Sequence, residues 1–144
     1  MNSGIWMTAF RDGIVAWIPM ESILERFVPH ISEPNGIEPG DDWYPLRFGQ
    51  EQASGGLSLH PRDDCCVPGL SIERPPDDLA FWQIIAGILR DFPCVLYWPS
   101  TIKTFCMGKA EMLVHLPADF AASCGAPVVS TDAAYIRDWI GAHS

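Results

Sequence analysis

The densest group of side chains that could do chemistry lies in the segment HPRDDCC, residues 60–66. It supplies an imidazole, carboxylates and thiols, which are the ligand types that bind zinc and related metals. The spacing argues against such a site, because the adjacent thiols of Cys65 and Cys66 cannot easily face one tetrahedral ion. No Cys-x-x-Cys or paired histidines elsewhere complete a ligand set. We therefore predict no metal and no cofactor, and interpret the segment as an exposed acidic loop.

Hydroxyl groups at strand ends form a second candidate site. Ser100, Thr101 and Ser130 follow apolar runs that we predict to be strands, and open α/β sheets bind ligands beyond the carboxyl ends of their strands. Supporting motifs are missing, since neither the phosphate loops GxGxxG and GxxxxGKS/T nor a GxSxG nucleophile turn occurs. Turn and cap roles are therefore favoured. The alternative is a small enzyme or ligand-binding site formed by Trp98, Ser100, Thr101, Lys103, Ser130 and Asp132.

The acidic stretch ISEPNGIEPGDDWYP, residues 31–45, ends next to a Trp-Tyr pair. Between Glu33 and Asp78 lie ten of the eighteen acidic residues but only three of the nine basic ones. A solvated loop needs no aromatic anchor, whereas Trp and Tyr are favoured at the centres of protein interfaces. We predict a partner-binding surface made of Glu38, Asp41, Asp42, Trp43, Tyr44, Asp63 and Asp64.

Two other interpretations of this stretch stay open. Trp43 could instead pack into the core beneath the loop, because Trp is highly buried on average. The carboxylates could also bind calcium, although the Asp-x-Asp-x-Asp-Gly spacing of a calcium loop is missing.

Length and composition limit the possible classes of protein. A chain of 144 residues that is 48% apolar and 11% aromatic matches one compact domain, residues 1–144, and argues against disorder. Its net charge of −9 would repel a phosphate backbone or an anionic membrane, so we expect neither nucleic acid nor a membrane as partner. No apolar run approaches a membrane span, and Arg11 and Asp12 interrupt any N-terminal signal peptide. Five cysteines, two of them adjacent, form a poor disulfide framework, which favours the cytoplasm.

Apolar spacing predicts the elements that position these residues. In the first half, residues 14–18 form a strand-like run. A helix follows whose buried face is Met20, Ile23, Leu24 and Phe27, and we expect it to end at Pro29. Residues 32–68 are rich in turn residues, which predicts an acidic, loop-rich segment around short strands such as YPLRF and GLSLH.

The second half is more regular. GLSIER predicts a strand, Asp77 or Asp78 is placed to cap the next helix, and CVLYW is apolar enough for a central strand covered on both faces. KAEMLVHL and PADFAASCG indicate a helix that is broken at Pro117. PVVS indicates a short strand, and Thr131 is placed to cap the last helix. The first long helix is predicted to bury a stripe made of Phe81, Trp82, Ile85, Ile88, Leu89 and Phe92. The last helix is predicted to bury a stripe made of Tyr135, Ile136, Trp139 and Ile140. This alternation predicts an α/β domain with a mixed, mostly parallel sheet, flanking helices and antiparallel N-terminal edge strands.

The last third of the chain carries a resemblance to a known family. VLYWP, then HLP, then GAPVVS leading into the last helix, is similar to small immunity proteins encoded beside bacterial secreted toxins. The resemblance implies a cytoplasmic, non-catalytic protein that neutralises a toxin domain by covering its active site. The charge fits this role independently, because an acidic surface speeds the capture of a basic partner. We expect a basic protein partner, a cognate toxin domain, and no enzymatic activity.

Overall fold

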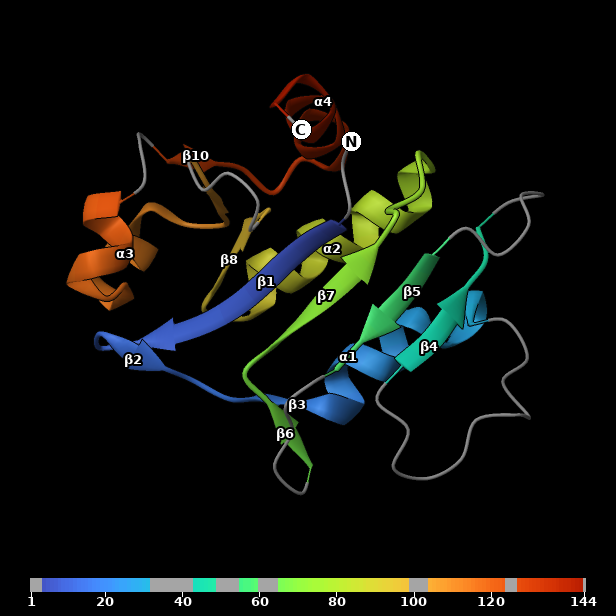
Figure 1. Ribbon diagram of the computed structural model, residues 1–144, viewed down its shortest axis with the longest axis horizontal. Helices are drawn as coiled ribbons and strands as arrows, with labels where there is room; N and C mark the ends of the chain where they lie inside the picture. Colours follow the sequence, from blue (N-terminus) through green and yellow to red (C-terminus); the bar gives the residue numbers. More distant parts are fainter. Residues whose placement is uncertain are drawn as a thin grey trace.

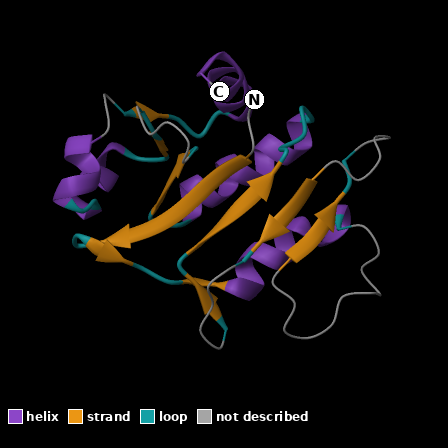
Figure 2. Cartoon of the chain, in the orientation of Figure 1, coloured by secondary structure: helices purple, strands orange, loops and turns teal. Residues whose placement is uncertain are grey.

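The fold is built on a sheet whose central strand is the N-terminal strand β1 (Gly4–Arg11) (Figures 1 and 2). The computed structural model describes residues 4–31, 43–48, 55–59, 65–98, 104–123 and 127–143. The strand order is β10-β9-β8-β1-β7-β5-β4. Apart from β1, these strands are β4 (Trp43–Leu46), β5 (Gly55–Ser58), β7 (Gly69–Glu73), β8 (Cys94–Tyr97), β9 (Cys106–Met107) and β10 (Val128–Val129).

The prediction of a mostly parallel sheet is wrong, since the strands are mostly antiparallel. Among the described strands, β9 and β10 form the one parallel pair. The predicted crossover exists, because β7 and β8 run in the same direction and are joined through helix α2 (Leu79–Asp91). However, β1 lies between them and is antiparallel to both, so the result is a split β-α-β arrangement. The N-terminal strand is therefore the centre of the sheet, not its edge.

The run predicted as one strand over residues 14–18 is divided between two sheets. Strand β2 (Ile14–Val15) forms a hairpin with β1, and β3 (Ile18–Pro19) pairs with β6 (Cys66–Val67). The hairpin loop consists of Asp12 and Gly13, whose φ values of 53° and 85° are those of a type I′ turn. An Asp-Gly pair between apolar residues is a strong hairpin signal, and it explains why the chain reverses here.

Helices α1 (Met20–Phe27), α2 and α4 (Ala133–His143) form the main core with one face of the sheet. In Figure 1, α1 and α2 lie behind the sheet, and α4 packs against α2. Ile5 and Met7 of β1 and Leu70 and Ile72 of β7 point toward this layer. The prediction of α2 is confirmed, including its cap, because the Ala80 amide donates to the Asp78 carboxylate at 2.8 Å. The predicted stripe of α2 buries Phe81, Trp82, Ile85, Ile88 and Leu89, whereas Phe92 lies just past the end of the helix and is only partly buried. On α4, Ile136, Trp139 and Ile140 are buried, but Tyr135 is exposed.

The opposite face of the sheet is covered at one end by a second, smaller core. A 3-10 helix, η3 (Ala110–His115), and α3 (Ala118–Ser123) lie on either side of Pro117, where the sequence predicts a break. Phe120 of α3 contacts Phe10, Tyr97 and Phe105 with ring centroids 5.2–5.6 Å apart. Within the described ranges, no helix lies over β7, β5 and β4 on this face (Figure 2). The same ranges contain no helix that is both long and apolar enough to cross a membrane.

Candidate functional site

The predicted partner-binding surface is only partly described by the structure. Its carboxylates Glu38, Asp41, Asp42, Asp63 and Asp64 lie outside the described residues, so their role stays a prediction. Two further members of the surface, Trp43 and Tyr44, begin β4 and point to opposite faces of the sheet. Tyr44 is 4% exposed and belongs to the main core, which makes its ring inaccessible to a partner. Trp43 is 47% exposed, so it is not the core residue of the alternative interpretation.

Trp43 is the first residue of a row that crosses five strands. The registers pair Trp43 with Ser58, Ser58 with Ser71, Ser71 with Trp6, and Trp6 with Tyr97. Directly paired residues project from the same face of a sheet, so the row forms one surface. Trp6 is 43% exposed. Three strand spacings place the Cα atoms of Trp6 and Trp43 roughly 14 Å apart, with the two serines between them.

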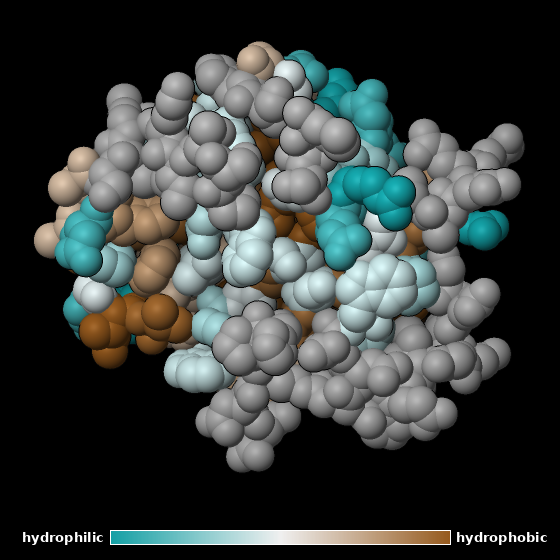
Figure 3. All heavy atoms as spheres, in the orientation of Figure 1, coloured by the Kyte–Doolittle hydropathy of each residue, from teal (hydrophilic) through white to brown (hydrophobic). Residues whose placement is uncertain are grey.

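The floor between the two indoles is made of residues with small side chains. Gly4, Gly56 and Gly69 share this face with Ser58 and Ser71. A Cβ atom on Gly56 would overlap the indole of Trp43, which means that the ring lies over this glycine. Covering a strand glycine with a cross-strand aromatic side chain also stabilises the strand pair. The middle of the face is pale in Figure 3, as expected for Trp, Ser and Gly atoms that are neither strongly polar nor strongly apolar.

Tyr97 closes one end of the row and Glu73 adds a charge to it. The Tyr97 hydroxyl lies 3.0 Å from the Thr8 hydroxyl, and the Tyr97 ring packs edge-on against Phe120 at 5.6 Å. Glu73 is exposed and pairs with both Gly4 and Gly56, so its carboxylate belongs to the same face. We call the surface of Trp6, Trp43, Ser58, Ser71, Glu73 and Tyr97 the open face. Its side chains suit it to contact with a partner.

At the predicted strand-edge site, the described residues have structural roles. The Asp132 amide donates to the Ser130 hydroxyl at 3.0 Å, and the Tyr135 amide donates to the Asp132 carboxylate at 2.9 Å. The cap of α4 is therefore Asp132, not Thr131 as the sequence suggested. Trp98 is buried against Trp139, with ring centroids 5.2 Å apart. Three further members of this site, Ser100, Thr101 and Lys103, lie outside the described residues.

We expect Asp132→Ala to lower the free energy of unfolding by about 1 kcal/mol, because the first turn of α4 loses its cap. Asp138→Ala is the matched control, since Asp138 pairs with Arg137 at an exposed position worth less than about 0.5 kcal/mol. Urea denaturation followed by circular dichroism measures both changes. Equal losses in the two variants would contradict the cap assignment.

The buried thiols have low reactivity. Burial raises the pKa of Cys94 to about 12, with Cys106 adding to the shift. Burial likewise raises the pKa of Cys106 to about 12, although a hydrogen bond with the Ser130 backbone acts in the opposite direction. Both groups are therefore neutral thiols at physiological pH and poor nucleophiles. The described residues also contain no group of three or more His, Cys, Asp or Glu that could hold a metal ion.

The fold and the site together define a class: an α/β protein with an exposed aromatic row on one face of a mostly antiparallel sheet. Comparisons with protein-family models, curated proteins and solved structures find no match to this chain. Sequence reasoning identified only Trp43 of the open face and missed Trp6, Ser58, Ser71, Glu73 and Tyr97. Trp6 is the most important of the missed residues, because it is the second exposed indole of this face. A signal existed, because Ile5, Met7 and Ala9 alternate with Trp6 and Thr8 in the period of a half-buried strand.

Proposed function

We propose that this protein is a non-catalytic binding protein that holds a basic protein partner on its open face. The row from Trp43 to Tyr97 is the observation that carries the proposal. Two half-exposed indoles separated by small residues offer anchors of the kind that dominate protein interfaces. In its finer form, suggested by the resemblance of the C-terminal third, the partner is a toxin domain whose active site is covered in the cytoplasm.

The shape of the open face favours a protein partner over a small molecule. Small ligands bind in concave sites that enclose most of their surface. The open face is instead a broad strip in which the Cα atoms of the two tryptophans lie roughly 14 Å apart across the strands. A standard protein interface covers about 800 Å² on each partner, an area that can span both indoles.

Charge favours a basic partner. The chain carries a net charge of −9, Glu73 lies on the open face, and Asp41 and Asp42 immediately precede Trp43 in the sequence. Complementary charge accelerates the encounter between partners, whereas buried aromatic anchors determine how long the complex lasts. A surface that combines indoles with carboxylates is therefore suited to bind a basic partner rapidly and to release it slowly.

The test compares Trp6→Ala with Trp17→Ala in complexes with the product of the neighbouring gene. Trp17 is the matched control, because it is 50% exposed but lies between β2 and β3 and is not part of the row of paired residues. We expect Trp6→Ala to weaken binding at least about tenfold, mainly through faster dissociation, and Trp17→Ala to leave it unchanged. Surface plasmon resonance separates the two rates.

Ser71→Arg is a second variant that blocks the same surface by another route. It places a bulky cation between the two indoles, where it would obstruct a partner and repel a basic one. Thermal unfolding by circular dichroism verifies that each variant is folded. If folded Trp6→Ala and Ser71→Arg proteins bind like the wild type, the partner does not use this face and the proposal fails.

A further inference from the structure

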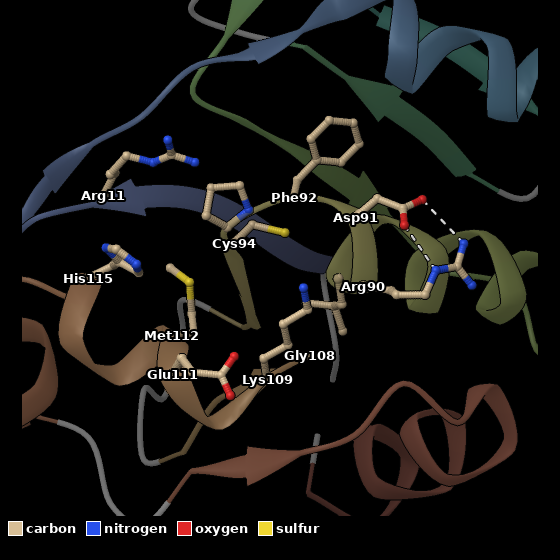
Figure 4. Close-up of a pocket in the computed structure, with 12 residues that line it drawn as sticks. Arg11, Arg90, Asp91, Phe92, Cys94, Gly108, Lys109, Glu111, Met112 and His115 are labelled. Atoms are coloured by element: carbon tan, nitrogen blue, oxygen red, sulfur yellow. Dashed lines mark hydrogen bonds and ion pairs between the residues drawn. The ribbon is translucent and has the colours of Figure 1, made fainter.

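A pocket of about 280 Å³ lies where the C-terminal end of α2, the start of β8 and the helix η3 meet. Its charged lining consists of Arg11, Arg90, Lys109, Asp91 and Glu111, and His115 forms another part of the wall (Figure 4). Three of the nine Lys and Arg residues of a strongly acidic chain thus line one small cavity. Such a local excess of positive charge is unexpected and calls for a physical explanation.

Part of this charge is already compensated within the structure. Arg90 Nε donates to Asp91 at 2.9 Å, and Arg26 Nη2 donates to the same carboxylate at 2.7 Å. The hydrogen bonds from Arg90 and then Arg26 lower the pKa of Asp91 to about 2, so this carboxylate stays ionised. One anion faces two cations here, and the group keeps a net positive charge.

Arg11 and Lys109 are different, because neither forms an ion pair within 4 Å in the described part of the chain. Figure 4 shows the guanidinium of Arg11 and the ammonium of Lys109 pointing toward the middle of the pocket from opposite sides. Glu111 is the one lining carboxylate besides Asp91. The lining as a whole therefore carries one more cation than anion, and Arg26 behind Asp91 adds another.

The carbonyl end of α2 offers a structural explanation for some of these cations, but not for all. A helix C-terminus carries roughly half a negative charge, which favours nearby cations. Arg90 lies in the last turn of α2, and Arg26 of α1 reaches Asp91 at that end of the helix. Arg11 comes from the end of β1 and Lys109 from the segment before η3. Four cations around one helix end exceed what half a charge requires.

Two hydrogen bonds support part of the pocket wall. The Asp12 amide donates to His115 Nδ1 at 3.2 Å, and the Gly13 amide donates to the His115 carbonyl at 3.0 Å. These bonds join η3 to the turn that follows Arg11. Because Nδ1 accepts a hydrogen bond, the neutral imidazole carries its proton on Nε2 and can donate it. Pro93, Cys94 and Met112 supply an apolar floor.

We propose that this pocket binds a small anion of the phosphate class, with Arg11 and Lys109 as the groups that contact its oxygens. Arg and Lys are the residues that proteins use to hold phosphate oxygens. The volume suits inorganic phosphate or a small phosphomonoester whose carbon part rests on the apolar floor. None of the residues that line the pocket belongs to the open face, and Arg11 projects from the side of the sheet opposite to Trp6. The anion site is therefore separate from the open face and independent of the proposed function.

The proposal is tested by titrating the ¹⁵N-labelled protein with inorganic phosphate and, separately, with phenyl phosphate at constant ionic strength. We expect saturable shifts of the amides of Arg11 and of residues 108–112 with at least one of the probes. Tighter binding of phenyl phosphate would identify a phosphomonoester as the ligand type, and equal binding would identify free phosphate. Arg11→Gln and Lys109→Gln should each weaken binding at least about tenfold, as expected for loss of a charge-assisted bond.

Arg137→Gln is the matched control, because Arg137 is paired with Asp77 and Asp138 outside the pocket. It should bind like the wild type, and Lys109→Arg should retain most of the affinity that Lys109→Gln loses. The proposal is overturned if neither probe saturates, or if folded Arg11→Gln and Lys109→Gln proteins bind normally. It is also overturned if Arg137→Gln weakens binding equally, since the effect would then be one of net charge.

Discussion

Gly69→Ala is expected to lower the free energy of unfolding by about 3 kcal/mol, at the upper end of the usual cost of overpacking. Gly69 begins β7 directly opposite Thr8 of β1. A Cβ atom there would collide with the Met7 carbonyl oxygen and come within 3.0 Å of the Met7 carbonyl carbon and of Thr8 Cα. These are backbone atoms of the central strand, so no side-chain rotation relieves the contact. The pairing that connects the two halves of the sheet would have to move.

Gly141→Ala provides a control of the opposite sign. Gly141 is an exposed residue of α4, and a Cβ atom there would meet no atom within 4 Å. Because glycine is less favourable than alanine in a helix by up to about 1 kcal/mol, this variant should be slightly more stable than the wild type. Urea denaturation measures both free energies. Equal stability of the two variants would show that β1 and β7 do not pair in the register given above.

Local patterns predicted the individual elements well. Helix α2 followed from its apolar stripe and from a cap at Asp77 or Asp78, of which the structure uses Asp78. Both α1 and β8 followed from apolar runs. These signals succeed because each depends on residues a few positions apart, where the sequence alone determines the geometry. The Asp12-Gly13 turn was equally local and could have been recognised, which would have placed β1 and β2 in a hairpin.

The sheet order was not predictable in the same way. The same alternation of strands and helices occurs in two kinds of sheet. The two strands joined by a helix can be parallel neighbours, or a third strand can lie between them. The choice depends on the pairing of β1 with β7 and β8, strands that lie more than sixty residues away. The same long-range registers create the open face, since Trp6 and Trp43 share one row only through β5 and β7. The charged pocket likewise depends on the fold, because Arg11 and Lys109 line it together although they are far apart in the chain.

Cys94 and Cys106 are expected to resist alkylation at pH 8 in the folded protein, whereas Cys65 reacts. The thiolate is the reactive form, and with a pKa of about 12 each buried group is ionised in roughly one molecule in ten thousand at this pH. A thiol in water, which ionises near pH 8.5, has more than about a thousandfold larger thiolate fraction. Exclusion of the reagent from these buried positions adds to the difference. Cys65 is exposed, so a reagent reaches it directly.

Iodoacetamide labelling followed by peptide mass spectrometry measures the alkylation rate of each cysteine. The Cys65→Ser variant should lose the fast alkylation of Cys65, while the slow alkylation of Cys94 and Cys106 stays unchanged. Labelling in urea is the control, because unfolding should bring Cys94 and Cys106 to the rate of an ordinary thiol. This pattern would show that the buried thiols of Cys94 and Cys106 serve packing. Rapid modification of Cys94 in the folded protein would contradict it, because the thiol lies on the floor of the charged pocket and would then be an accessible nucleophile.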